Sequence, residues 1–372
     1  MTYIHQRVMD ASPIRLGLIG AGWIGSFHAE SVVHRIPNAR LEAIADPDFP
    51  VANALAARLG VSKVSADPAD VVDDPDIDAV IISAPARFHA NLISACAQAG
   101  KHVFCEKPGA RNMEELDKAL EAVQAAGVGI QFGFNRRYAK DFAAAKKLVD
   151  DGTVGTPQLL RSLTRDPGSA SGLANAGRIA PGTIFLETLI HDFDTLNWLN
   201  PGAVPVRVHA VADALVAPEL RPNGLQDTAV VTITYSNGAI AVAEANFNAL
   251  YGYDVRGEVF GSAGMITVGG PQHSSATSYT SSGIGAATVR LNTELFFDAY
   301  TAELAEFVTG VESGRDGRQQ AAGAPRGIDA RNALAVALAA FRSAETGQPV
   351  DVSAIANLRA SQPEAYAAVE LA

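Results

Sequence analysis

The chain has 372 residues, 48% of them hydrophobic, which exceeds the size at which a single core stops growing and predicts two globular domains. A net charge of −11 and scattered lysines and arginines exclude a basic surface for nucleic acid or anionic lipid. Two cysteines cannot build a disulfide framework, residues 1–13 lack a signal-peptide core, and no apolar run approaches the roughly 20 residues that span a bilayer, so we expect a cytoplasmic protein without nucleic-acid or membrane partners.

The first predicted elements are a buried strand over residues 14–19, a glycine turn and a helix. In that turn Gly20 permits the tight bend, Gly22 lets backbone N–H groups approach a pyrophosphate, and Gly25 lets the helix pack closely on the strand. The phosphates would lie on the helix N-terminus. An ordinary strand-to-helix turn is the alternative, and the alternating strands and helices that follow argue against it.

A second strand, over residues 41–45, ends at Asp46. Asp46 lies roughly 20 residues after the turn, where a carboxylate can accept both hydroxyls of an adenosine ribose. A 2′-phosphate there would meet like charge, so NAD is favoured over NADP as the cofactor. Asp46 alone could also be a helix cap or a turn residue.

Strand and helix signals then alternate up to residue 133, which predicts six parallel strands wound as βαβ units. Strands are expected near residues 64, 79–83, 103–105 and 130–132, with helices over about 51–59, 92–96 and 113–126. The fold class is therefore α/β: an extension over 1–13, a Rossmann dinucleotide-binding domain over 14–134, and a second domain over 135–372.

The second domain is predicted to be α+β, with a large open antiparallel sheet. Its strands are expected over 157–164, 206–212, 228–235, 239–247 and 253–260, and its helices over about 139–149, 185–199, 295–312 and 328–346. Residues 166–182 are expected to form a mobile loop, and residues 269–285 an exposed hairpin tip. Because few helices are available to cover the sheet, a homo-oligomer that buries its other face is expected, a dimer or a tetramer.

Ligands of a doubly wound sheet bind at the carboxyl ends of its strands. Lys107 follows the fifth strand, where it could hold a substrate hydroxyl and stabilise the developing alkoxide; a surface lysine is the alternative. Pro108 is a candidate for a cis peptide bond. The predicted cofactor contacts are Gly20, Gly22, Trp23, Ile24, Gly25, Asp46, Ser83, Pro85, His89, Glu106 and Lys107.

The predicted helix over 185–199 carries Glu187 and His191, four residues apart and thus neighbours on an α-helix. A histidine with a carboxylate one turn away can act as a general base, and the acid can orient the imidazole. A structural histidine and a metal ligand are the alternatives. No metal site is predicted, because no further histidine or cysteine shares the spacing.

Together these motifs resemble the Gfo/Idh/MocA oxidoreductases, and within them the inositol 2-dehydrogenase-like members. The resemblance covers nearly the whole chain and depends on residues 20–25, 100–108, 133–138, 164–167, 190–194, 251–254 and 259–262. It implies a C-terminal sheet used for oligomerisation and NAD-dependent oxidation of a ring hydroxyl on a cyclitol or sugar. It also implies that Lys107 binds the reacting oxygen, that His191 accepts the proton, and that Arg136, Thr164 and Asp194 lie near the substrate.

Two departures from the family pattern concern the substrate. Glu187 stands where inositol dehydrogenases typically have an aspartate, which moves the carboxylate by about 1.5 Å. Residues 246–248 lack the expected basic pair, and residues 168–182 do not match the family's proline-rich loop, so another cyclitol or a pyranose is also open. Two other functions remain as alternatives: an NADP-linked aldose dehydrogenase or reductase, and a non-catalytic nicotinamide-binding sensor.

Overall fold

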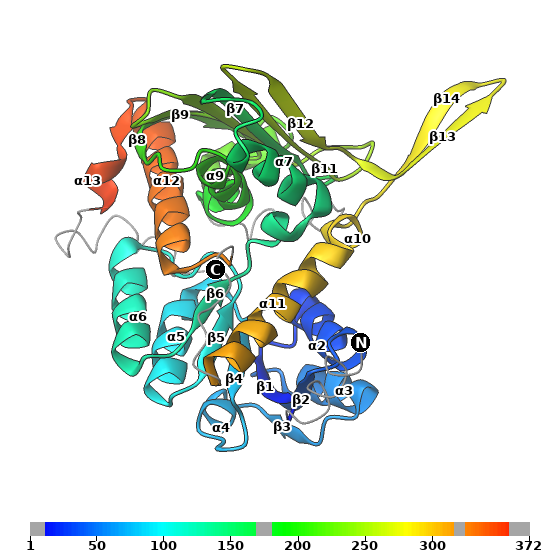
Figure 1. Ribbon diagram of the computed structural model, residues 1–372, viewed down its shortest axis with the longest axis vertical. Helices are drawn as coiled ribbons and strands as arrows, with labels where there is room; N and C mark the ends of the chain where they lie inside the picture. The colour runs from blue at the N-terminus through cyan, green and yellow to red at the C-terminus, as the bar shows by residue number, and fades with distance from the viewer. Residues whose placement is uncertain (1–11, 169–180, 316–323, 357–372) are drawn as a thin grey trace. The chain divides into compact units, whose positions relative to one another are not determined.

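In the computed structural model, which describes residues 12–168, 181–315 and 324–356, the chain divides into two compact units (Figure 1). The first comprises Met1–Ala110, Glu115–Gly133 and Tyr300–Gly327, and the second comprises Arg111–Glu114, Phe134–Ala299 and Ile328–Ala372. The sequence pattern placed all of 135–372 in the second domain, whereas the contacts of Tyr300–Gly327 group this segment with the first unit.

The first unit is built on a six-stranded sheet in the order β3-β2-β1-β4-β5-β6, with every neighbouring pair parallel. This is the Rossmann strand order, so the predicted parallel sheet is confirmed. The two central strands, Ile14–Ile19 and Ala79–Ile82, are almost wholly apolar because both faces of the sheet are covered by helices. The strands are β1 (Ile14–Ile19), β2 (Ala39–Ala45), β3 (Lys63–Ser65), β4 (Ala79–Ile82), β5 (His102–Cys105) and β6 (Ile130–Phe132).

Helices cover the two faces of this sheet as right-handed crossovers require (Figure 1). The helices α2 (Trp23–Arg35) and α3 (Phe49–Leu59) pack on one face, while α5 (His89–Gln98) and α6 (Met113–Ala126) lie on the other. On the first face α11 (Phe297–Arg315) adds Leu304, Phe307, Val308 and Val311 to the buried core. These four apolar side chains explain why the segment belongs to the first unit. Two short helices complete it: α4 (Ala69–Val72) and η1 (Ala86–Phe88).

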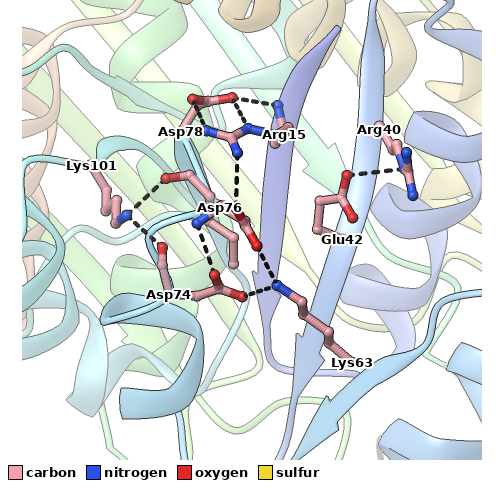
Figure 2. Close-up of polar contacts among 9 residues, drawn as sticks. Arg15, Arg40, Glu42, Lys63, Asp74, Asp76, Asp78 and Lys101 are labelled. Atoms are coloured by element: carbon pink, nitrogen blue, oxygen red, sulfur yellow. Dashed lines mark hydrogen bonds and ion pairs between the residues drawn. The ribbon is translucent and has the colours of Figure 1, made fainter.

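The amino ends of the parallel strands carry a network of charged side chains (Figure 2). Arg15, on β1, pairs with Asp78 at 3.0 Å, and Lys63, on β3, pairs with Asp74 at 2.6 Å. Lys101, just before β5, donates to the backbone carbonyls of Asp74 and Ile77. These contacts hold together the loops at one edge of the sheet, and the opposite, carboxyl edge is the one where a ligand is expected.

The second unit is built on a seven-stranded sheet in the order β12-β11-β7-β10-β9-β8-β15. The predicted antiparallel sheet is in fact mixed, because β7 and β10 pair in parallel, with Leu160 opposite Ala241. A parallel pair needs a long connection, and between β7 and β10 the described part of the chain passes through three helical segments and two further strands. The strands are β7 (Pro157–Arg165), β8 (Pro205–Asp213), β9 (Thr228–Tyr235), β10 (Ile240–Asn246), β11 (Asp254–Gly261), β12 (Met265–Gly269) and β15 (Val350–Asp351).

One face of this sheet is covered and the other is open. Along β9, Ala229 and Val231 are buried while Val230 between them is exposed, which is the alternation of a half-buried strand. On the covered face α9 (Leu189–Trp198) packs on β7 and β10, α7 (Lys140–Asp150) packs on β12, and α12 (Gly327–Thr346) reaches β8, where the Ser343 hydroxyl accepts the N–H of Ala210. The remaining helical segments are η2 (Asn135–Tyr138), η4 (Ile184–Thr188), η5 (Pro218–Asn223), α10 (Asn292–Leu295) and α13 (Val352–Ala356).

A hairpin of β13 (Gln272–Thr280) and β14 (Gly283–Thr288) extends away from the sheet of this unit (Figure 1). Tyr279 and Ile284 are exposed on it, so the predicted exposed hairpin is confirmed. Most of the loop predicted over 166–182 lies outside the described residues. Among the described helices, none combines the length and the apolar character needed to cross a membrane.

Candidate active site

The glycine turn of the first unit has the geometry that a pyrophosphate needs. Gly20 has a φ of +98°, and a Cβ there would lie 2.7 Å from the backbone of Ser83 and Ala84. A Cβ at Gly25 would lie 2.0 Å from the Gly20 carbonyl oxygen, so neither position accepts a side chain. At Gly22, by contrast, a Cβ would meet nothing within 4 Å. The open space at Gly22 is therefore where the backbone can approach a ligand.

The N-terminus of α2 suits an anion. Within the described residues, no side chain caps this helix and no acidic residue lies in its first turn. Trp23 and Ile24 open the helix, and Trp23 is exposed. The positive end of the helix dipole thus lies beside the open space at Gly22, so this part of the chain fits the pyrophosphate of NAD.

Asp46, at the end of β2, is held by the glycine turn. Its Oδ2 accepts the N–H of Ala21 at 2.7 Å, and its Oδ1 accepts the N–H of Asp48 at 2.8 Å. A carboxylate offers about four acceptor positions, so each oxygen keeps one for a ribose hydroxyl. The turn role and the ribose role that the sequence left as alternatives are compatible at this residue.

The residues that follow β4 contact the glycine turn. The Ser83 hydroxyl donates to the Gly20 carbonyl at 2.8 Å, and Pro85 is exposed at the start of η1. His89 is buried, with Nδ1 2.7 Å from the Pro108 carbonyl and Nε2 2.6 Å from the Ala84 carbonyl. Burial lowers the pKa of His89 although both carbonyls oppose this shift. Because a neutral imidazole has a single N–H, it donates to one carbonyl only, and the ring joins the ends of β4 and β5. Its predicted contact with the cofactor stays a prediction.

Glu106, Lys107 and Pro108 follow β5, and the Lys107–Pro108 peptide bond is cis, as the sequence suggested. Lys107 is half-buried, and its backbone N–H donates to Glu106 Oε2 at 3.2 Å. Glu106 Oε1 lies 2.8 Å from His28 Nε2, on α2. The carboxylate of Glu106 is thus turned into the protein, toward a helix that the sequence did not connect with it.

In the second unit, the segment that carries Glu187 and His191 is not the single α-helix predicted over 185–199. It begins as a π-helical turn, η4, and continues as α9 from Leu189. Glu187 is exposed in the π turn, whereas His191 is half-buried in α9, with its ring edge-on to Phe134 at 6.2 Å. The α-helical spacing assumed for Glu187 and His191 therefore does not hold over the first turn. π turns of this kind frequently occur at functional sites.

A buried cluster lies beside His191 and centres on Asp192. Arg136 donates to Asp192 through Nη1 at 2.8 Å, and the hydroxyls of Ser162 and Thr164 donate to the same carboxylate at 2.5 and 2.7 Å. Arg136 Nη2 also donates to Thr164 Oγ1 at 2.6 Å. Arg136 and Thr164, predicted near the substrate, thus direct their polar groups at Asp192 and tie α9 to β7.

A second buried pair joins Arg137 to Asp194, the third predicted substrate neighbour. The guanidinium donates through Nε at 2.8 Å and through Nη2 at 2.5 Å, and it also contacts Asp329 at 3.0 Å. Burial raises the pKa of Asp194 and by itself would lower that of Arg137, but the two carboxylates raise the pKa of Arg137 overall. We take the pair as ionised, because two-point contact with a carboxylate favours the charged forms of both partners.

The sequence did not single out several residues that the structure brings into such clusters: Arg137, Ser162, Asp192 and Asp329 in the second unit, and His28 with Glu303 beside Glu106 in the first. Asp192 and Asp194 follow His191, and this run of polar and charged residues on an otherwise apolar helix was the available signal. Glu303, on α11, carried no such signal, because its position beside Glu106 depends on how a distant helix packs.

Two family models match the chain. Residues 14–134 match an oxidoreductase family with an NAD-binding Rossmann fold, and residues 142–267 match the GFO/IDH/MocA C-terminal domain. The chain is 36% identical to a myo-inositol 2-dehydrogenase of Thermotoga maritima, across 92% of this chain and 99% of that protein. It is 34% identical to an NAD(+)-dependent scyllo-inositol 2-dehydrogenase of Bacillus subtilis, across 91% and 96%.

Solved structures agree with these matches. A scyllo-inositol dehydrogenase of Lactobacillus casei, with bound NAD(H) and scyllo-inositol, superimposes with a TM-score of 0.86 at 30% identity. The superposition covers 92% of this chain and all of that one. A myo-inositol 2-dehydrogenase of Lactobacillus plantarum gives a TM-score of 0.85 at 31% identity, across 91% and 99%.

Proposed function

Because the chain belongs to the Gfo/Idh/MocA family, we propose that it oxidises a ring hydroxyl of a cyclitol to a ketone. The relatives named above are NAD-dependent oxidoreductases that act on CH–OH groups. The observation that carries this proposal is the match to inositol 2-dehydrogenases over more than nine tenths of both chains. The alternative open to the same residues is a pyranose substrate, since Glu187 replaces the aspartate that the family pattern has.

In the first unit, Gly20, Gly22 and Gly25 with the N-terminus of α2 hold the pyrophosphate, and Asp46 accepts the ribose hydroxyls. When bound, NAD supplies the hydride acceptor. Lys107 holds the substrate oxygen by a charge-assisted hydrogen bond and stabilises the negative charge that develops on it.

In the second unit, His191 accepts the proton of the substrate hydroxyl as general base, while the hydride leaves the carbon that bears this hydroxyl. One proton and one hydride leave the alcohol, and a ketone remains. Glu187 then tunes or orients the base from the π turn. Arg136, Thr164 and Asp194 act through α9, because their buried polar groups fix this helix against β7 and against Arg137.

The test is the rate of NAD reduction with a panel of inositols, aldopyranoses and pyranosides. Lys107→Met and His191→Ala should each lower kcat by about 10²-fold or more, because general acid–base groups contribute roughly 10²–10⁴. NAD binding, measured by fluorescence titration, should stay near wild type. Lys147→Met and His34→Ala, at exposed positions, are the matched controls.

Wild-type turnover by both variants would rule out the assigned roles. NAD binding without turnover across the whole panel would instead favour the nicotinamide-binding sensor. Turnover of an aldose with NADP alone would favour the aldose dehydrogenase.

We also propose that the open face of the second unit's sheet forms a homo-oligomer, a dimer or a tetramer. Large apolar side chains are exposed on this face, on six neighbouring strands: Leu159, Val211, Val230, Ile240, Phe260 and Met265. A contiguous exposed patch of this kind marks an interaction site. Val230→Glu should dissociate the oligomer in sedimentation experiments, whereas Val33→Glu, at an exposed position on α2 of the first unit, should leave it intact. An unchanged assembly in the first variant would exclude this face.

A further inference from the structure

Three ionisable side chains meet inside the first unit, and one of them directly precedes Lys107 in the chain. They are His28 on α2, Glu106 at the end of β5 and Glu303 on α11. One nitrogen or oxygen atom of each lies within 4.8 Å of the corresponding atoms of the other two. All three are buried, Glu303 and His28 completely and Glu106 with 7% of its surface exposed. Two carboxyl groups this close in a dry interior cannot both be ionised at low cost.

The hydrogen bonds assign the negative charge to Glu106. Its Oε1 lies 2.8 Å from His28 Nε2, and its Oε2 accepts the Lys107 N–H. His28 Nδ1 is buried without a hydrogen-bond partner among the described residues. An orphaned lone pair is tolerated better than an orphaned N–H, so the His28 proton belongs on Nε2, where it is donated to Glu106. Burial alone would raise the pKa of Glu106, but the bond from His28 and the charge of Lys107 lower it.

The hydrogen-bond partners of the buried polar atoms also indicate that Glu303 is neutral. Neither of its carboxyl oxygens has a hydrogen-bond partner among the described residues, and its side chain has no exposed surface. A carboxylate in such a place would lose its hydration without any donor to replace it. Burial, and then the nearby Glu106, raise the pKa of Glu303 well above its usual value.

We propose that Glu106 and Glu303 form a buried carboxyl pair that holds one proton, on Glu303, and that the single charge left on Glu106 positions Lys107 and balances its ammonium group. The second half of this proposal depends on the proposed role of Lys107 at the substrate oxygen. Glu303 is a positioning residue, since it acts through Glu106. The other titratable groups facing the pair are His28, His89, Cys105, Lys107 and Tyr300.

The pair itself is tested without substrate, by infrared difference spectra of the full-length protein at neutral pH. Wild type minus Glu303→Gln should show the carbonyl band of one protonated carboxylic acid, and this band should persist as the pH rises to 8. A carboxylate band in its place would overturn the proposal. So would a stoichiometric divalent cation that Glu303→Gln releases, detected by elemental analysis, because the cation would then replace the proton.

The coupling to Lys107 is tested by the pH dependence of kcat/KM. Glu106→Gln removes the charge next to Lys107, so the high-pH limb should move to lower pH by about one unit, and kcat/KM above that limb should fall about tenfold. Glu303→Gln replaces a neutral group by a neutral group of the same shape and should leave the limb in place. Equal shifts in both variants would overturn the coupling. If the wild type oxidises no cyclitol, the proposed function fails, while the infrared result still decides the protonation of the pair.

Discussion

Asp192 is the acceptor on which the buried cluster of the second unit depends, and its removal should be costly. Asp192→Ala would take from Arg136 its carboxylate and from Ser162 and Thr164 their common acceptor. The guanidinium, with 4% of its side chain exposed, would stay buried without its hydrogen-bonded carboxylate. Breaking a buried pair in this way costs about 3–5 kcal/mol.

The double variant Arg136→Met with Asp192→Leu separates the charge effect from packing. Replacing both partners by apolar residues leaves no buried charge, so it should cost clearly less than Asp192→Ala alone. Asp151→Ala, which breaks the exposed pair with Lys147 at 2.6 Å, is the matched control and should change the free energy of unfolding by about 0.5 kcal/mol or less.

Urea unfolding followed by tryptophan fluorescence can report this unit alone, because the chain has two tryptophans, Trp23 in the first unit and Trp198 in the second. In a Trp23→Phe background, the signal comes from Trp198 on α9, whose ring lies 5.6 Å from the Arg137 guanidinium. A loss below about 1 kcal/mol for Asp192→Ala, or a double variant as unstable as the single one, would refute the reasoning, since the buried charge would then not be the cause.

Three further predictions concern the first unit. Gly25→Ala should lower stability by about 1–3 kcal/mol because its Cβ would strike backbone, whereas Gly22→Ala should keep the melting temperature and weaken NAD binding in calorimetry; the reverse pattern would contradict the roles assigned to the two glycines. Asp46→Ser should raise the ratio of NADP to NAD kcat/KM about tenfold or more, and an unchanged ratio would mean that Asp46 does not bind the ribose. The folded protein keeps the proton on Glu303, whereas the unfolded chain loses it near the ordinary glutamate pKa of 4.5. The free energy of unfolding of wild type relative to Glu303→Gln should therefore be greatest below pH 4.5 and should fall by about 1.4 kcal/mol per pH unit above it. A pH-independent difference in urea unfolding would argue against a neutral Glu303.

The local features of the fold were within reach of the sequence. The strand runs of the first unit are apolar and bounded by turn residues, and the glycine turn has the spacing that its geometry requires, so both could be located from neighbouring residues alone. The alternating strands of the second unit were equally visible, and Thr228–Tyr235 is the strand that was predicted.

What the sequence could not supply depends on contacts between distant segments. The parallel pairing of β7 with β10 is set by the path of the chain, not by the composition of either strand. The return of α11 to the first unit follows from where its apolar face packs, and with it comes Glu303 beside Glu106. The π turn before α9 has the composition of an ordinary helix, so periodicity predicted α-helix there.

That π turn also makes chain length, and not only residue identity, a determinant of where Glu187 points. A π turn contains more residues than an α turn over the same length of helix axis. The side chains of η4 therefore point in other directions around the axis than a continuous α-helix with α9 would give them. Deleting one residue from Ile184–Thr188 would turn everything before the deletion by about 100° relative to α9, and a substitution at Glu187 cannot produce such a rotation. Among related chains, a one-residue difference in this turn would therefore reorient the carboxylate while every side chain of α9, His191 included, kept its place.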